Sequence, residues 1–398
     1  SSSIDLSWTT ASGADGYLII QRQGSDPTGT PSDANAYAVS NTIGDGTVAA
    51  LITSGATTST TISGLSGDTQ YNYSIVPFAW DGSNAATYNY RTSATIPTAN
   101  AVTFSSSSDV TATGGFSYPT NVDYASYQEN SNLTSGNSVA AFGVTVRDGG
   151  GSDADAVGTT LTAISFTATN VGYIRRAALY DGGTELAEIA VSGSPIVFTG
   201  ISATAPDDGT KDLTLRVSYT TNVTDNAQYS FSVSSVTAST SGSGFAAADG
   251  GGATSSTAGD NNRIEVTASK LDFTTQPSTS ATAGVALATQ PVVTARDANN
   301  KTDLDYAGTV TLTNSGSLSM TNNATAASSG VVTYSGFRFN AGGTSITLST
   351  SNGDGLTDAP ASNAINIFEA EPTTQATNIT FSSIVQNGMT VNWTNEIG

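Results

Sequence analysis

Short stretches in which apolar residues alternate with serine or threonine recur along the whole sequence. Glycine, asparagine or aspartate bounds them, and they include "TTSTTISGL", "YSFSVSSV", "IEVTASKLDF", "VTLTNSG" and "SITLSTS". A period of two places alternate side chains on opposite faces of a strand, and the bounding residues favour turns. No stretch of ten or more residues shows helical periodicity. The pattern therefore predicts an all-β chain of β-sandwiches in series.

The composition favours several small cores over one large core. The chain has 398 residues, enough for two to four domains. Only 37% of the residues are hydrophobic and 11% are charged. Small cores between threonine-rich strands fit these proportions better than a large enzyme does.

Charge and missing residue types narrow the functions that are open to the chain. The formal net charge of -20 repels nucleic acid phosphates and anionic lipid headgroups, and attracts cations such as calcium. Cysteine and histidine are absent, which removes thiol chemistry, the Ser-His-Asp triad and the usual zinc ligands. A pair of carboxylates could still hydrolyse a glycoside, but small sandwiches offer no obvious cleft. We therefore expect a protein that is not an enzyme.

Residues 1–97 resemble a fibronectin type III domain. Trp8 in "IDLSWTT" stands at the family's core tryptophan of strand B, and "GYLIIQR" follows as strand C. Leu65 and Tyr71 in "LSGDTQYNYSIVPFA" fit the family's pattern before strand F. The resemblance implies that Tyr71 packs its ring and bonds its hydroxyl to nearby backbone. Nothing before Ser1 supplies a strand A.

Residues 370–398 read as strands A and B of a further domain of the same kind. "NITFSSI" is the expected strand A, and the expected strand B leads to Trp393, which lies 385 positions after Trp8 (393 − 8). This spacing favours one period of a longer tandem array, with further copies of the repeat as its partners. The alternative is a fragment of a multidomain protein without repeats.

Two further domains are expected between these ends. Residues 98–270, with "RDGGGSDADA", "ALYDGG" and "GSGFAAADGGGATSS", predict one large β-sandwich. They resemble a repeat of very long secreted surface proteins of Bacteroidota, and this resemblance implies export across the outer membrane by the type IX route. Residues 271–369 resemble the bacterial immunoglobulin-like domains of invasin and intimin type proteins, through Gln276-Pro277, Ala283-Gly284 and the stretch 293–300. In that stretch Asn300 replaces the usual glycine, and it can also take a positive φ.

The stretch "RDGGGSDADAVG", residues 147–158, is the first candidate site. Asp148, Asp153 and Asp155 could bind calcium with carbonyl groups turned inward by the glycines, or the stretch could be a plain flexible loop. It lacks the lysine and the helix of a phosphate-binding loop.

A second acidic group occurs in "TARDANNKTDLDYAG". Asp297, Asp303 and Asp305 could bind calcium near one strand end, or could simply favour turns. Apart from Ca²⁺, no cofactor is expected.

Aromatic residues beside turns offer a route to glycan binding. The candidates for stacking on a sugar are Trp80, Tyr118 and Tyr124, and the alternative is that these rings pack on strands.

Together these features predict a stalk or filament segment of an extracellular, cell-surface-attached bacterial adhesin. A tip outside this sequence would contact a surface glycan, a host or an abiotic surface, and we expect no direct membrane insertion. The alternative function is an array of carbohydrate-binding modules, accessory to a secreted glycan-active enzyme.

Overall fold

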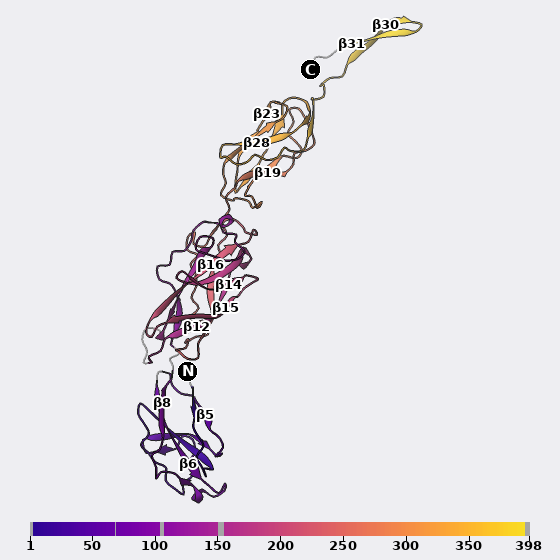
Figure 1. Ribbon diagram of the computed structural model, residues 1–398. Coiled ribbons are helices and arrows are strands. Elements are labelled where there is room, and N and C mark those ends of the chain that lie inside the picture. Colours follow the sequence, from indigo (N-terminus) through magenta and orange to yellow (C-terminus); the bar gives the residue numbers. More distant parts are fainter. Residues whose placement is uncertain (1–2, 68, 104–106, 150–154, 395–398) are drawn as a thin grey trace. The chain divides into compact units, whose positions relative to one another are not determined.

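The computed structural model describes residues 3–67, 69–103, 107–149 and 155–394. Strands dominate these ranges, and the helical pieces are single 3-10 turns (Figure 1). The prediction of an all-β chain of sandwich domains is therefore confirmed. Among these residues, no helix has the length and apolarity that crossing a bilayer requires. The chain divides into two compact units, Ser1–Asn222 with Gln228–Arg263, and Val223–Ala227 with Ile264–Gly398.

The N-terminal sandwich, residues 3–103, is built from one sheet of two strands and one larger sheet. The small sheet pairs β1 with β5, and the large sheet has the order β3-β4-β2-β6-β7, with β8 also paired to β6. The strands are β1 (Ser3–Ser7), β2 (Gly16–Gln23), β3 (Thr42–Ile43), β4 (Gly46–Ile52), β5 (Ser59–Ser63), β6 (Gln70–Ala79), β7 (Asn89–Tyr90) and β8 (Thr98–Val102), with the 3-10 turn η1 (Ala85–Thr87).

Trp8 and Tyr71, two of the residues that carry the fibronectin resemblance, lie where the resemblance implies. Trp8 packs against the core between the two sheets, and its ring lies 5.3 Å from that of Tyr17 in an edge-on arrangement. Tyr71 is buried, and its hydroxyl accepts a hydrogen bond of 3.0 Å from the backbone N–H of Ser66. The predicted role of Tyr71 is confirmed.

Strand β2 is buried on both faces. Leu18 and Ile20 belong to one apolar cluster and Ile19 to another, so the central strand of the large sheet separates two cores. Burial on both faces explains why "YLII" is a continuous apolar run. The cluster of Leu18 and Ile20 also contains Tyr88 and Tyr90, and Tyr90 belongs to β7 of the large sheet.

The central sandwich spans residues 107–222 and 228–263. It consists of a sheet of five strands and a sheet of three strands. Their orders are β14-β13-β16-β11-β9 and β15-β12-β17. The strands are β9 (Asp109–Ala112), β10 (Val122–Asp123), β11 (Val139–Arg147), β12 (Thr159–Ala168), β13 (Ile174–Asp181), β14 (Thr184–Ala190), β15 (Ile196–Ala205), β16 (Thr210–Tyr219) and β17 (Phe231–Ala238), with the 3-10 turns η2 (Tyr124–Ser126) and η4 (Val171–Tyr173).

A β-bulge in β15 shifts its alternation of buried and exposed side chains by one residue, where it pairs with β12. Ile196 and Phe198 are buried in alternation, but the next buried side chain, Ile201, comes three positions later. Gly200 takes a φ of +70° there, and the pairing with β12 shifts register at the same place. A residue with a Cβ is strained at this φ, so glycine permits the extra residue.

The C-terminal sandwich, residues 223–227 and 264–369, encloses one continuous apolar core. Its sheets have the orders β19-β21-β25, β20-β29-β27, β24-β22-β28 and β23-β26. The strands are β18 (Ile264–Glu265), β19 (Lys270–Thr275), β20 (Ser280–Thr282), β21 (Val292–Arg296), β22 (Thr309–Asn314), β23 (Met320–Thr321), β24 (Ala324–Ala326), β25 (Val331–Thr333), β26 (Arg338–Phe339), β27 (Gly343–Ile346), β28 (Leu348–Asn352) and β29 (Ile365–Phe368).

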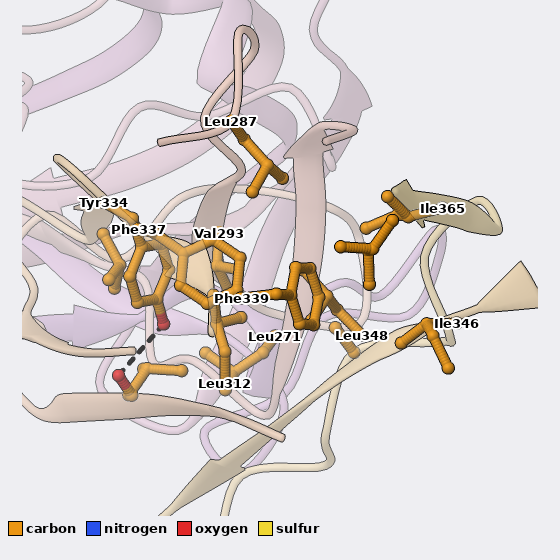
Figure 2. Close-up of a cluster of buried hydrophobic side chains, with 14 of the residues drawn as sticks. Leu271, Leu287, Val293, Leu312, Tyr334, Phe337, Phe339, Ile346, Leu348 and Ile365 are labelled. Carbon is orange, nitrogen blue, oxygen red and sulfur yellow. Dashed lines mark hydrogen bonds between the residues drawn. The ribbon is translucent and has the colours of Figure 1, made fainter. Parts of the chain in front are cut away.

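Aromatic rings fill the middle of this core (Figure 2). Phe337 lies 5.4 Å from Phe339 and 6.3 Å from Tyr334, measured between ring centroids. The Tyr334 hydroxyl donates a hydrogen bond of 3.0 Å to the carbonyl oxygen of Val310, drawn as a dashed line in Figure 2. The one polar atom of the aromatic cluster is therefore satisfied inside the core.

The final strands β30 (Thr377–Val385) and β31 (Gly388–Thr394) form an antiparallel hairpin. The predicted strands in 370–398 are thus present. Their large apolar side chains are exposed, among them Ile379 (61%), Phe381 (57%) and Trp393 (60%).

Candidate functional site

The loop at residues 147–158 is anchored at both ends by its own carboxylates. Asp148 is buried, and accepts hydrogen bonds from the Thr159 hydroxyl (2.5 Å) and the Asp208 N–H (3.1 Å). Asp155 accepts from the Val157 N–H and the Ser243 hydroxyl, each at 3.0 Å. Asp153 lies outside the described residues. Both described carboxylates therefore have a structural function as hydrogen-bond acceptors.

Further acidic groups surround the same loop. The pKa of Asp207 is raised, first by desolvation and then by the nearby negative charges of Asp208, Asp148 and Asp155. A cation would relieve this repulsion. Nevertheless, no three acidic side chains within the described ranges gather closely enough to hold a metal ion.

The acidic residues of "TARDANNKTDLDYAG" organise turns. Asp297 accepts a hydrogen bond of 2.7 Å from the Lys301 N–H, and Asn300 takes a φ of +64°, as the sequence predicts for this position. The two oxygens of Asp303 accept from the N–H groups of Ala268, Asp305 and Tyr306 at 2.8 to 3.0 Å. Asp303 is buried and Asp305 is exposed. The loop thus has the geometry of a turn stabilised by backbone donors.

Asp225 is the acidic residue that the sequence analysis missed. It is 3% exposed and accepts 2.7 Å hydrogen bonds from the Val266 and Leu304 N–H groups, one at each carboxylate oxygen. Burial raises the pKa of Asp225, the two N–H donors oppose that rise, and the charges of Asp303 and Asp305 add to it. All these groups belong to the second compact unit, although Asp225 comes from a loop 39 positions before Ile264 (264 − 225). No local pattern in the sequence reveals this contact.

The three predicted glycan contacts have different surroundings. Trp80 is half-buried, stacks on Tyr88 at a centroid distance of 5.0 Å, and donates its Nε1–H to the Asn84 carbonyl oxygen (3.2 Å). Tyr118 is half-buried and packs edge-on against Phe116. Tyr124 is 0% exposed. The expectation for Tyr124 is therefore wrong, because a fully buried ring cannot stack on a sugar; the alternative, packing, holds for it.

A groove in the central sandwich is lined by Tyr118 and by a second tyrosine, Tyr127. Tyr118 and Tyr127 line a cavity of about 480 Å³ that Asp123 and Arg216 also line. Aromatic rings with a carboxylate and a guanidinium give a polar groove with stacking surfaces. Tyr118 is thus the predicted glycan contact with the most suitable setting.

Comparisons with known proteins find similarity in solved structures alone. No protein-family model matches the chain, and no curated protein matches its sequence. A biofilm-associated protein domain matches with a TM-score of 0.24 and 10% identity, over 99% of this chain and 85% of the other. An Escherichia coli adhesin, FdeC, matches with a TM-score of 0.26 and 14% identity, over 92% and 97%. Three fibronectin domains of chicken CNTN1 match with a TM-score of 0.18 and 10% identity, over 92% and 93%. Scores of this size establish no shared function, so the function has to be argued from the chain's own residues.

Proposed function

We propose that this chain is a structural segment, a stalk or filament part, of a large extracellular bacterial surface protein of the adhesin type. The observation that carries the proposal is the series of small sandwiches, each with its own buried apolar residues. Antiparallel sandwiches in series suit a spacer that holds a distant contact site away from a cell. The acidic surface and the lack of cysteine and histidine agree with a role without catalysis.

Repetition along the full-length protein is part of the proposal. Strand β31 ends in "VNWT" and the first strand leads into "LSWT", so Trp393 and Trp8 hold the same place in the two strand patterns. We propose a period of about 385 residues on this basis (393 − 8). Export from a Bacteroidota cell by the type IX route is proposed on the resemblance of residues 98–270 alone. Counting further copies of "NWT" and "LSGDTQY" in the whole gene tests the period.

Single-molecule pulling of the chain tests the mechanical function. A stalk should unfold in separate events, one per sandwich, which release roughly 35 nm of extended chain for a sandwich of about 100 residues and roughly 50 nm for the larger central sandwich. Labelling of intact cells with an antibody against the chain tests the location. A single smooth extension without events, or labelling only after cells are permeabilised, would contradict the proposal.

Calcium binding at residues 147–158 is proposed as a way to stiffen the central sandwich. The repulsion around Asp207 supports it, since a bound cation would lower that repulsion. Calcium at 100 times its dissociation constant should stabilise the folded chain by about 2.7 kcal/mol, and EDTA should remove the gain. An unchanged melting temperature in EDTA would contradict calcium binding, as would an equal gain in Asp155→Asn.

Glycan binding is the second candidate function, and the groove lined by Tyr118 and Tyr127 favours it. A glycan array with the whole chain separates the two functions. Binding that is lost in Tyr118→Ala but retained in Trp80→Ala would assign the groove. Silence across the array would favour the stalk.

A further inference from the structure

One arginine of the central sandwich is held in a fixed position without a carboxylate partner. From β16, Arg216 donates its Nε–H to the Ser138 hydroxyl (2.9 Å), and its Nη2 donates to the carbonyl oxygens of Ser135 (2.9 Å) and Ser138 (2.7 Å). Its Cζ lies 6.0 Å from the centre of the Tyr180 ring. None of the ion pairs among the described residues involves Arg216, and none of its hydrogen bonds there uses Nη1. One nitrogen of a fixed guanidinium is therefore left for a ligand.

The charge of Arg216 is also partly removed from water. The side chain is half-buried, and this burial lowers the pKa of Arg216, while the neighbouring phenols of Tyr180 and Tyr127 act in the opposite direction. Burying a charge without a counter-ion is unfavourable. Arg147 and Arg176 of the same sandwich each have a carboxylate partner. For Arg216, an anionic ligand would supply the counter-charge that the described residues do not.

The groove of Tyr118 and Tyr127 contains this arginine. Arg216 lines the cavity of about 480 Å³ together with Ser135 and Ser138, the residues that fix its guanidinium. The rings of Tyr118 and Tyr127 are half-buried, so part of each ring is accessible. A tyrosine ring offers an apolar face and a polar hydroxyl, which suits contact with a sugar ring that has both kinds of surface. A fixed cation and two stacking surfaces thus line one groove.

Asp123 lines the same groove, and its carboxylate has a structural function. Its Oδ1 accepts a hydrogen bond of 3.2 Å from the Ala125 N–H, and its Oδ2 accepts one of 2.6 Å from the Ser126 hydroxyl, at the start of η2. A ligand therefore meets a positive charge at one place in the groove and a negative charge at another. An acidic sugar fits this arrangement, because it has one anionic group and several neutral hydroxyl donors.

We propose that this groove binds an acidic sugar of a polysaccharide, with its carboxylate or sulfate group at Arg216 Nη1 and its ring against Tyr118 or Tyr127. The proposal rests on the glycan binding proposed above and names the class of glycan. A hydrogen bond from a guanidinium to an anion is stronger than one between neutral groups, so the charged group decides the affinity. The net charge of -20 repels polyanions at longer range, but salt screens exposed charges beyond about 8 Å at physiological ionic strength.

Binding of matched polysaccharides to the whole chain tests the class of glycan. The pairs are polygalacturonate with its methyl ester, and dextran sulfate with dextran, titrated in EDTA so that calcium cannot bridge two anionic groups. We expect the acidic member of at least one pair to bind about tenfold or more tightly than its neutral partner, the effect of one hydrogen bond to a charged group. The pair that shows the preference identifies carboxylate or sulfate as the bound group. Raising the salt concentration should weaken this binding.

Substitutions of Arg216 separate its charge from its structural function. Arg216→Gln should remove the preference for the acidic polysaccharide, because glutamine carries no charge. Arg216→Lys should retain most of the preference, since lysine loses the same set of guanidinium hydrogen bonds but keeps the charge. Arg175→Gln is the matched control and should bind as the wild type does, because Arg175 is a half-buried arginine of the same sandwich that does not line the groove.

Four outcomes would overturn the proposal. Equal binding of the acidic and neutral members would do so and would leave glycan binding by the groove intact. A preference that Arg216→Gln retains, or one that Arg216→Lys loses to the same extent as Arg216→Gln, would contradict the role of the charge. Poly-glutamate that binds as tightly as the acidic polysaccharide would show that no sugar is required. Silence toward every polysaccharide would contradict the glycan function as well, whereas the pulling experiment tests the stalk function separately.

Discussion

The N-terminal and C-terminal sandwiches differ in how completely they satisfy a buried tyrosine. Tyr73 is 2% exposed and its hydroxyl has no partner within the described residues. Tyr334 is 1% exposed and its hydroxyl donates to the Val310 carbonyl oxygen. Burial raises the pKa of Tyr73 to about 12, with the nearby Tyr71 as the lesser cause. Burial raises the pKa of Tyr334 as well, followed by the effect of Tyr306.

This difference follows from the strand pairing around the two residues. In the described part of the N-terminal sandwich one sheet consists of β1 and β5, and an apolar cavity of about 430 Å³, lined by Leu6, Trp8 and Ile75 among others, lies beside it. In the C-terminal sandwich the sheets enclose the aromatic cluster, and several of its side chains are fully buried. The Tyr334 hydroxyl thus has a backbone acceptor within its core, whereas the Tyr73 hydroxyl has none within the described residues.

Truncating a core leucine should show the largest difference. Leu312→Ala removes a 0% exposed side chain and should cost about 2–5 kcal/mol of unfolding free energy. Leu6→Ala removes a half-buried side chain that lines the apolar cavity, so about 1 kcal/mol is expected. Peptide-resolved hydrogen exchange in urea measures the loss of unfolding free energy in each variant, with the whole chain present. Equal losses would contradict the distinction between the two core positions.

Removing buried carboxylates should give the next largest effect. Asp225→Ala leaves the N–H groups of Val266 and Leu304 without their acceptor, which should destabilise the C-terminal sandwich by about 2–4 kcal/mol. Asp15→Ala is the matched change in the N-terminal sandwich, where an exposed carboxylate accepts from the Trp80 N–H. It should cost about 0.5–1 kcal/mol. Tryptophan fluorescence measures the effect of Asp15→Ala, because Trp8 and Trp80 lie in the N-terminal sandwich.

Deleting the two tyrosine hydroxyls tests the comparison directly. Tyr334→Phe loses the hydrogen bond to Val310 and should cost about 1–2 kcal/mol. Tyr73→Phe loses no bond and should be neutral or stabilising by up to about 1 kcal/mol, because an unpaired buried hydroxyl is unfavourable. Melting temperatures of the two variants, compared with that of the wild type, measure both effects. A Tyr73→Phe variant that melts well below wild type would reveal a partner for this hydroxyl.

The smallest effect should be a dependence on pH through Asp225. Burial raises the pKa of Asp225 in the folded state above the ordinary value of 3.8, so the folded state takes up a proton at a higher pH than the unfolded state does. Stability from this group therefore increases as pH falls from the folded pKa toward 3.8, and is constant at neutral pH. The stability difference between wild type and Asp225→Asn should widen in that window. A difference that narrows on acidification would show that the carboxylate is held ionised.

Local patterns in the sequence predict the strands, Trp8 and Tyr71, because each depends on residues close in the chain. Alternation identifies which side chains enter a core, and the "LSGDTQY" pattern places the Tyr71 hydroxyl beside the Ser66 backbone. Tyr124 and Asp225 could not be placed in this way. Tyr124 follows a turn sequence that suggests exposure, yet it is buried, and Asp225 contacts groups 41 and 79 positions away in the chain. Contacts of that separation depend on tertiary packing, which local periodicity does not encode.

The segment Val223–Ala227 also bears on how such proteins evolve by exchange of domains. A module can be copied into another gene as one uninterrupted piece only if all its residues are contiguous. The second compact unit includes a loop that precedes Ile264 by a long stretch of sequence belonging to the first unit. A recombination point just before Ile264 would separate Asp225 from the backbone groups that it caps. We therefore expect the central and C-terminal sandwiches to be inherited together, with recombination favoured outside the pair.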